Sequence, residues 1–216
     1  MLPPPLERAA DRYIELEREV DRLMPPGCAA ACVECAGPCC RAGMANQTIR
    51  CWWLREVSVR VHGRWWPEDW RQRAGCVALT PTGCLLSAGR PVNCRTWYCD
   101  AYLAGCKDLW QAVLCAFLSE LLPQTMLLAG NVYLPDLTED DGPAHAAAIA
   151  ERIEWAHRLL GRAKTLTDPT ADEPERLRTT IGLICILPGI LSDSVRGRLL
   201  RDLPGWAEYA APPADG

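Results

Sequence analysis

The sequence predicts a mainly α-helical protein, a helical bundle-like fold around an irregular cysteine-rich segment. Apolar residues recur at helical spacing near the start of the chain and throughout its second half. The part between these regions holds eleven of the 13 cysteines, is rich in Gly and Pro, and has no long periodic pattern. At 216 residues we expect one compact domain with three parts: an N-terminal helix (1–27), the cysteine-rich segment (28–106) and a helical half that packs on it (107–216).

The first predicted element is an amphipathic helix over residues 6–24. Charged residues fill its other faces, and its apolar face repeats at helical spacing through Tyr13, Leu16, Val20 and Leu23. Pro25, Pro26 and Gly27 follow directly, and they end the helix because proline cannot continue it.

One stretch of the cysteine-rich segment has a pattern of its own. Residues 54–66, "LREVSVRVHGRWW", are compatible with either a helix or a strand.

Two long helices are predicted after Cys106. The first ends near Pro123, and its stripe comprises Trp110, Val113, Leu114, Phe117, Leu118 and Leu121. The second lies within 141–161, with Pro143 near its start and Gly161 as its C-terminal cap. The apolar face of this second helix comprises Ile149, Ile153 and Leu160.

A third helix is predicted within 172–189, with Pro174 early and Pro188 late, and a short last helix over 192–203. The acidic run 139–141 is expected to be a solvated loop that leads into the second long helix, where negative charge suits the helix dipole.

Composition excludes several classes of protein. The formal net charge of −4 argues against a general nucleic-acid binder. The longest apolar runs (109–118 and 181–191) fall short of the ~18 residues that a membrane span needs, and no secretory signal is visible. We therefore expect a cytoplasmic protein with reduced thiols. A disulfide framework is not expected, since the cysteine count is odd and the chain is long enough to fold without one.

The first cysteine group has the spacing Cys28-x3-Cys32-x2-Cys35-x3-Cys39-Cys40. Thiolate is a soft ligand that suits zinc, copper(I) and iron–sulfur clusters, and a Cys-x2-Cys pair lets one turn present two sulfurs to one metal. The adjacent pair points to two irons, two metals, or one metal and one structural role, because neighbouring side chains diverge. We therefore expect residues 28–106 to bind a metal or an iron–sulfur cluster.

The second group is "GCVALTPTGCLLSAGRPVNCRTWYC", residues 75–99. A glycine precedes both Cys76 and Cys84 and permits the tight turns that a sulfur-ligated metal requires. Arg90 and Arg95 supply positive charge beside an anionic, thiolate-rich centre.

The stretch "CVECAGPCC", followed by "GC", "GC", "RPVNC" and "RTWYC", resembles the YkgJ-type proteins, described as a zinc- or iron-chelating CxxCxxCC domain. The resemblance covers residues 28–106 and extends to the cysteine domain of flagellin lysine N-methylase, for which an iron–sulfur cluster is implied. Three residues separate Cys35 from Cys39, where the family pattern usually has two. The resemblance nominates as ligands Cys32, Cys35, Cys39, Cys40, Cys76, Cys84, Cys94 and Cys99.

The remaining cysteines fall into two sets. Cys28 and Cys51 are further candidate metal ligands, with an ordinary buried thiol as the alternative, and Cys106 is a weaker candidate. Cys115 and Cys185 lie in apolar helical stretches and are expected in the core.

An all-thiolate ligand set favours iron–sulfur over zinc, because His62 is the only histidine near the segment. Eight ligands fit two 4Fe-4S cubanes, one larger cluster, or two zinc sites with four thiolates each. His145 and His157 are expected at the surface or in packing. Most of the nearby tryptophans are expected to fill the core, with exclusion of water from a cluster as the alternative: Trp52, Trp53, Trp65, Trp66, Trp70 and Trp97.

These observations predict an iron–sulfur protein that transfers electrons to, or assists, a metalloenzyme, with a protein partner and neither nucleic acid nor membrane. One alternative is an S-adenosylmethionine-dependent modifying enzyme, methylase-like by analogy with the flagellin-modifying relative. Cys28, Cys32 and Cys35 also have the spacing of radical enzymes that use this cofactor. Another is a zinc-stabilised interaction module or metal carrier. We assign no catalytic residue, since the chain shows no Ser/His/Asp order, phosphate-binding loop or convincing carboxylate pair.

Overall fold

The computed structural model describes residues 2–25, 46–72, 75–80, 83–92, 94 and 106–187. This part of the chain is mainly helical, which confirms the predicted fold class. Four long helices form the body: α1 (Pro4–Leu23), α8 (Leu109–Thr125), α9 (Gly142–Ala163) and α10 (Glu173–Ile186). The helix predicted over 192–203 lies outside the described residues.

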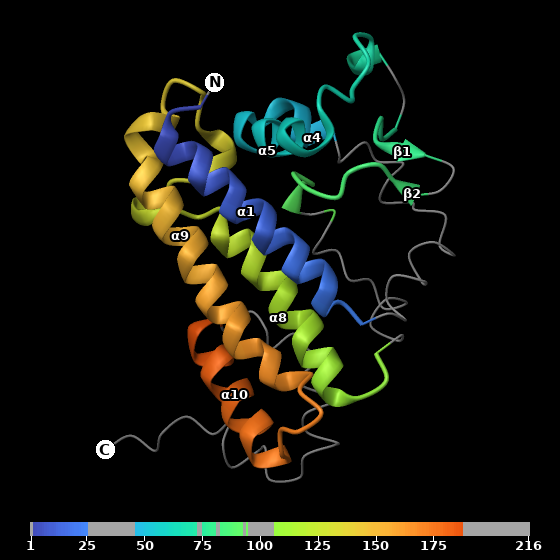
Figure 1. Ribbon diagram of the computed structural model, residues 1–216, viewed down its shortest axis with the longest axis vertical. Coiled ribbons are helices and arrows are strands. Elements are labelled where there is room, and N and C mark those ends of the chain that lie inside the picture. Colours follow the sequence, from blue (N-terminus) through green and yellow to red (C-terminus); the bar gives the residue numbers. More distant parts are fainter. Residues whose placement is uncertain are drawn as a thin grey trace.

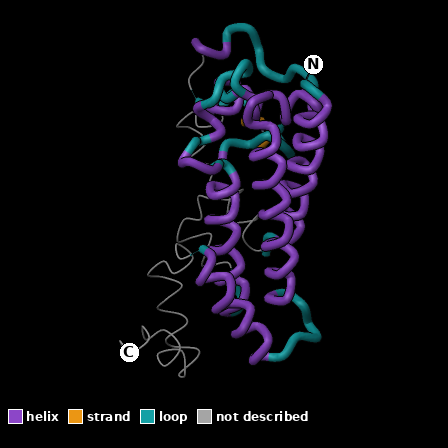
Figure 2. Tube along the Cα trace, turned by 90° about the vertical axis from the view of Figure 1, so that its left-hand side faces the viewer, coloured by secondary structure: helices purple, strands orange, loops and turns teal. Residues whose placement is uncertain are grey.

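The long helices pack lengthwise. α1 and α9 run side by side in the same direction, while α8 runs the opposite way behind them and α10 flanks the lower half of α9 (Figure 1). The view turned by 90° shows the same alignment along the longest axis (Figure 2). One continuous hydrophobic core joins α1, α5, α8, α9 and α10. Among the described residues, no helix combines the length and the hydropathy that a membrane span requires.

α1 confirms the predicted amphipathic helix within two residues at its start and one at its end. Pro4 and Pro5 suit its first turn, where the backbone N–H groups have no partner within the helix. Its buried face includes Tyr13, Leu16 and Val20, each at most 1 % exposed.

α8 is the central helix, and it is buried on most of its surface rather than along one stripe. Asp108 caps its start by accepting a hydrogen bond from the backbone N–H of Gln111 at 2.8 Å. The helix runs two residues past the predicted stop, to Thr125, with Pro123 in its last turn. A proline so close to the end disturbs only the final turn.

α9 begins as predicted, with Pro143 in its first turn and Ile149, Ile153 and Leu160 buried. The prediction that Gly161 caps it is wrong, because Gly161 lies inside the helix. The helix continues to Ala163, which is fully buried, and passes into the short helix η4 (Lys164–Leu166). Burial of Ala163 therefore outweighs the helix-breaking tendency of glycine here.

The middle of the chain contributes shorter elements at one end of the bundle. They are α4 (Asn46–Arg50), α5 (Trp52–His62), η1 (Trp70–Gln72) and a hairpin of two-residue strands, β1 (Leu79–Thr80) and β2 (Gly83–Cys84). Residues 54–66, for which the sequence is compatible with either a helix or a strand, are thus helical up to residue 62.

Tryptophans of α5 fill the core, as expected. Trp52 and Trp53 are 3 % and 0 % exposed, and the ring of Trp53 meets that of Tyr13 edge-on at 6.0 Å. Trp70 is also buried, Trp65 and Trp66 are half-buried, and Trp97 lies outside the described residues.

Two further short helices, η2 (Ala129–Asn131) and η3 (Leu134–Asp136), connect α8 to α9. The acidic run that follows is exposed, as predicted, and Glu139 forms an ion pair with Arg55 at 3.1 Å.

Candidate metal centre

Four of the ten predicted ligands lie in the described part of the chain: Cys51, Cys76, Cys84 and Cys94. The other six lie outside it: Cys28, Cys32, Cys35, Cys39, Cys40 and Cys99. Within the described residues, no three side chains of His, Cys, Asp or Glu are grouped closely enough to hold a metal ion. The convergence of the two cysteine groups therefore stays a prediction.

One of the described candidate ligands, Cys84, lies within residues 83–92, which we call the docking loop, and Cys94 lies two residues beyond its end. The middle of the loop is packed into the protein, since Leu86 and Ala88 are fully buried. Leu86 packs with Ala78, Trp65 and Cys76 in a small hydrophobic cluster, and the backbone N–H of Leu85 donates to the carbonyl oxygen of Ala78 at 2.8 Å. Apolar burial thus fixes the part of the loop that directly follows the hairpin.

Two buried polar side chains fasten the docking loop to helices. The backbone N–H of Gly89 donates to Oε2 of Glu17 on α1 at 2.6 Å. The carbonyl oxygen of Gly89 accepts a hydrogen bond from the hydroxyl of Thr48 on α4 at 2.8 Å. Glu17 and Thr48 are both fully buried, so these bonds are shielded from water and tie the loop to two different helices.

Gly89 permits this close approach. Its φ of +69° is a left-handed conformation, and a Cβ there would lie 2.6 Å from the carbonyl oxygen of Leu54. Only glycine fits a position that combines this backbone angle with this separation from α5.

His62 and Arg90 add polar contacts at the same loop. The backbone N–H of Ser87 donates to Nε2 of His62 at 3.1 Å, so this ring nitrogen acts as the acceptor. Burial, and then the positive charge of Arg90, lower the pKa of His62 and favour its neutral form. Nε of Arg90 donates to the carbonyl oxygen of Leu86 at 2.5 Å. His62 therefore supports the loop through its Nε2.

The cysteines of this region lie at the edges of the buried part. Cys84 and Cys94 are exposed, and Cys76 is half-buried. Cys84 pairs with Leu79 in the hairpin, and the backbone N–H of Cys94 donates to the carbonyl oxygen of Pro91 at 2.9 Å. The anchored loop thus leaves two thiols accessible, as metal or cluster loading requires.

Cys51 has a different environment. It lies in the main core at the N-terminus of α5 and is 5 % exposed. Burial raises the pKa of its thiol, which disfavours the thiolate form that binds metals. This environment favours an ordinary buried thiol over a ligand.

The cysteines of the helical half divide in an unexpected way. Cys115 is fully buried on α8, which confirms its place in the core. The Sγ atoms of Cys106 and Cys115 lie 3.6 Å apart, a contact that was not predicted from the sequence. The expectation that Cys185 is buried is wrong, because its side chain is exposed on α10. This helix buries Leu183 instead, with Leu187 just beyond its end.

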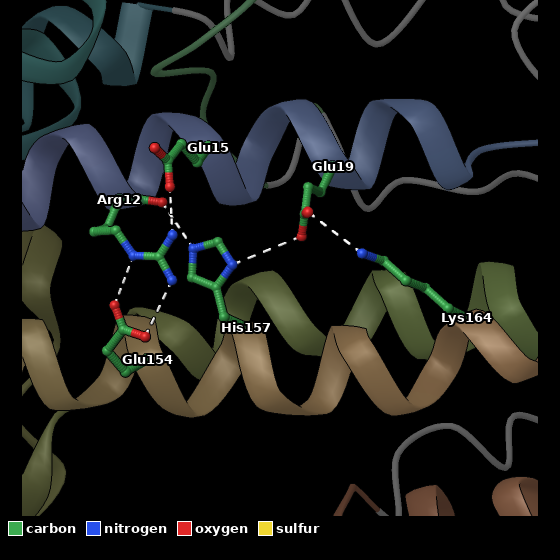
Figure 3. Close-up of polar contacts among 6 residues, drawn as sticks. All are labelled: Arg12, Glu15, Glu19, Glu154, His157 and Lys164. Atoms are coloured by element: carbon green, nitrogen blue, oxygen red, sulfur yellow. Dashed lines mark hydrogen bonds and ion pairs between the residues drawn. The ribbon is translucent and has the colours of Figure 1, made fainter.

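His157 lies in the interface between α1 and α9, as expected for a packing residue. Its Nε2 is 2.9 Å from the carbonyl oxygen of Arg12, and its Nδ1 is 3.7 Å from Glu19 (Figure 3). Arg12 also bridges Glu15 and Glu154, and Lys164 contacts Glu19 at 3.3 Å. These groups form a polar seam along two helices and not a ligand cluster.

The described residues thus define a helical bundle that carries a docked, cysteine-bearing loop. Comparison of the chain with family models, curated proteins and solved structures finds no match. The YkgJ-type resemblance therefore rests on the cysteine pattern itself.

Proposed function

We propose that the protein binds one or two iron–sulfur clusters of the 4Fe-4S type through its cysteine-rich segment, and that it transfers electrons to, or assists, a metalloenzyme. The observation that carries the proposal is the density of cysteines between residues 28 and 106, in two groups at ligand spacing. The ligands that we propose are the eight nominated by the resemblance: Cys32, Cys35, Cys39, Cys40, Cys76, Cys84, Cys94 and Cys99.

The geometry of the docking loop supports this proposal. A cluster needs ligands that are held in place yet accessible. The buried residues Leu86, Ala88 and Gly89 hold the chain between Cys84 and Cys94, both of which are exposed. When bound, a cluster would supply one-electron redox chemistry. The role of Glu17 and Thr48 would be to keep the loop at a fixed place on the bundle.

Metal and sulfide analysis of anaerobically purified protein, together with electron paramagnetic resonance, tests the proposal. We expect brown protein that contains iron and acid-labile sulfide in matched amounts and gives a cluster signal on reduction. Colourless protein with stoichiometric zinc would refute the iron–sulfur assignment and establish the zinc-module alternative. Cleavage of S-adenosylmethionine by the reduced protein would replace the electron-transfer role with the modifying-enzyme alternative.

Substitutions of single cysteines test the ligand set. Cys35→Ser and Cys94→Ser should release metal and destabilise the protein, because ligand binding contributes to folding. Cys185→Ser is a matched control for Cys94→Ser, since both thiols are exposed, and it should keep its full metal content. Equal metal loss in all three variants would show that the ligand set is wrong.

A further inference from the structure

We propose that His62 fastens the docking loop in a pH-dependent way: its neutral ring holds the loop at Ser87, and its protonated ring releases this part of the loop. The geometry of one hydrogen bond carries the proposal. The backbone N–H of Ser87 donates to Nε2 of His62 at 3.1 Å, which joins the last residue of α5 to the middle of the loop. This bond is separate from those of Gly89 to Glu17 and Thr48.

The hydrogen bond exists only while the ring is neutral. A backbone N–H needs a lone pair to donate to, and both nitrogens of a protonated imidazole are donors. Protonation of His62 would therefore set a ring N–H against the backbone N–H of Ser87. The hydroxyl of Ser87 lies 3.3 Å from the same ring nitrogen and can accept from the protonated ring, but this exchange still removes the acceptor of the backbone N–H.

The charges around His62 favour release on acidification. In the described part of the chain, Arg90 of the loop is the charged group that acts on the ring, and no carboxylate opposes it. On α1, which packs against α5, the carboxylates of Glu7 and Asp11 pair with Arg60 instead. Burial, and then Arg90, lower the pKa of His62 from its ordinary 6.5. The stabilising effect of the bond is thus present above pH 6.5 and is lost as the pH falls through the lowered pKa.

The release is local and does not unfold the loop. Ser87 lies between Leu86 and Ala88, both of which are fully buried, and their packing does not depend on pH. Cys84 lies three positions before Ser87, so acidification changes how firmly the chain beside this candidate ligand is held. That consequence for a metal rests on the proposed function, whereas the pH-dependent bond itself does not.

The test is hydrogen–deuterium exchange of the full chain from about pH 8 to about pH 5, read amide by amide by mass spectrometry and corrected for the intrinsic rate at each pH. We expect the protection of the Ser87 amide to fall roughly 2- to 12-fold on acidification, as loss of one hydrogen bond gives. Leu85, whose N–H donates to the carbonyl oxygen of Ala78, is the internal reference and should keep its protection. His62→Gln should make the protection of Ser87 independent of pH, and His145→Gln, a control on α9, should leave the fall unchanged.

Constant protection of Ser87 in the unsubstituted protein would overturn the proposal. So would an equal fall in His62→Gln, because the pH dependence would then come from another group, such as Glu17. Exchange of the C2 hydrogen of His62, followed by mass spectrometry across the same pH range, gives the titration midpoint of this ring without any variant. A midpoint below 6.5 supports the proposal, and one at or above 6.5 overturns it. Iron and acid-labile sulfide, measured on the same samples, report separately on the proposed cluster.

Discussion

The substitution Gly89→Ala tests the attachment of the docking loop. The new Cβ would lie 2.6 Å from the carbonyl oxygen of Leu54 and 2.7 and 2.8 Å from the backbone nitrogen and Cβ of Ser58. All three atoms belong to residues of α5, and two of them are backbone atoms, so they cannot move aside without shifting the helix. The hydrogen bonds of Gly89 to Glu17 and Thr48 would then be strained as well.

The expected loss in the free energy of unfolding has two parts. A left-handed conformation costs a non-glycine residue about 1–2 kcal/mol, and forced overlap in a packed region costs about 1–3 kcal/mol. The free energy of unfolding should therefore fall by about 2–5 kcal/mol, a large share of the roughly 5–15 kcal/mol of a typical domain. Urea unfolding followed by circular dichroism measures this change.

Gly63→Ala is the matched control. Gly63 has a similar φ of +66°, but a Cβ there would meet no described atom within 4 Å. It should cost only the conformational part, about 1–3 kcal/mol, because with its ψ of −165° Gly63 has a backbone conformation that is almost restricted to glycine. Equal losses for the two variants would refute the close approach of the docking loop to α5. If the loop also positions the proposed ligands, Gly89→Ala should retain less metal than Gly63→Ala.

Three further predictions concern the helices and their polar contacts. Glu17→Ala should lower the free energy of unfolding by about 1–3 kcal/mol, because it leaves the buried N–H of Gly89 without this acceptor, while Glu17→Gln should cost less since an amide oxygen still accepts; equal losses in urea unfolding would contradict the assigned bond. A hydrogen bond from Arg12 lowers the pKa of Glu154, so the stabilising effect of this carboxylate is present above its ordinary pKa and is lost as the pH falls through the lowered one. Because both side chains are nearly half exposed, the effect should stay below about 1 kcal/mol, and Glu154→Gln should flatten the acid limb of a stability–pH curve; an unchanged limb would argue against the pair. Leu114→Ala should cost about 2–5 kcal/mol in the same urea assay, since the side chain is fully buried on α8, and a loss below about 1 kcal/mol would argue against this burial.

The sequence predicted a helix well where both its apolar repeat and its stop signals lie in or next to the helix itself. The apolar repeat and the flanking prolines of α1 placed its ends within two residues. The sequence did not decide between helix and strand for residues 54–66, because a short apolar pattern fits both the helical and the strand periodicity. Packing of Trp53 against Tyr13, a residue 40 positions earlier, accompanies the helical form and is invisible in the local pattern.

Two predictions failed because burial is decided by neighbours in space. Gly161 is a good local stop signal, yet the core that encloses Ala163 keeps the helix intact beyond it. Cys185 lies among apolar residues in the sequence, yet α10 buries Leu183 on a different face and leaves the thiol exposed.

The prediction of a metal centre came from residue types and spacing alone, because closely spaced cysteines in a reduced compartment are more often metal-binding or catalytic than disulfide-bonded. The sequence also determined the helical class and the positions of the long helices, since their periodicity is local. Only the tertiary structure decided that Glu17 holds Gly89, 72 positions away, and that Cys106 meets Cys115. Gly89 and Cys106 both lie outside the helices, and tertiary packing sets where these residues meet α1 and α8, so spacing along the chain carries no record of either contact.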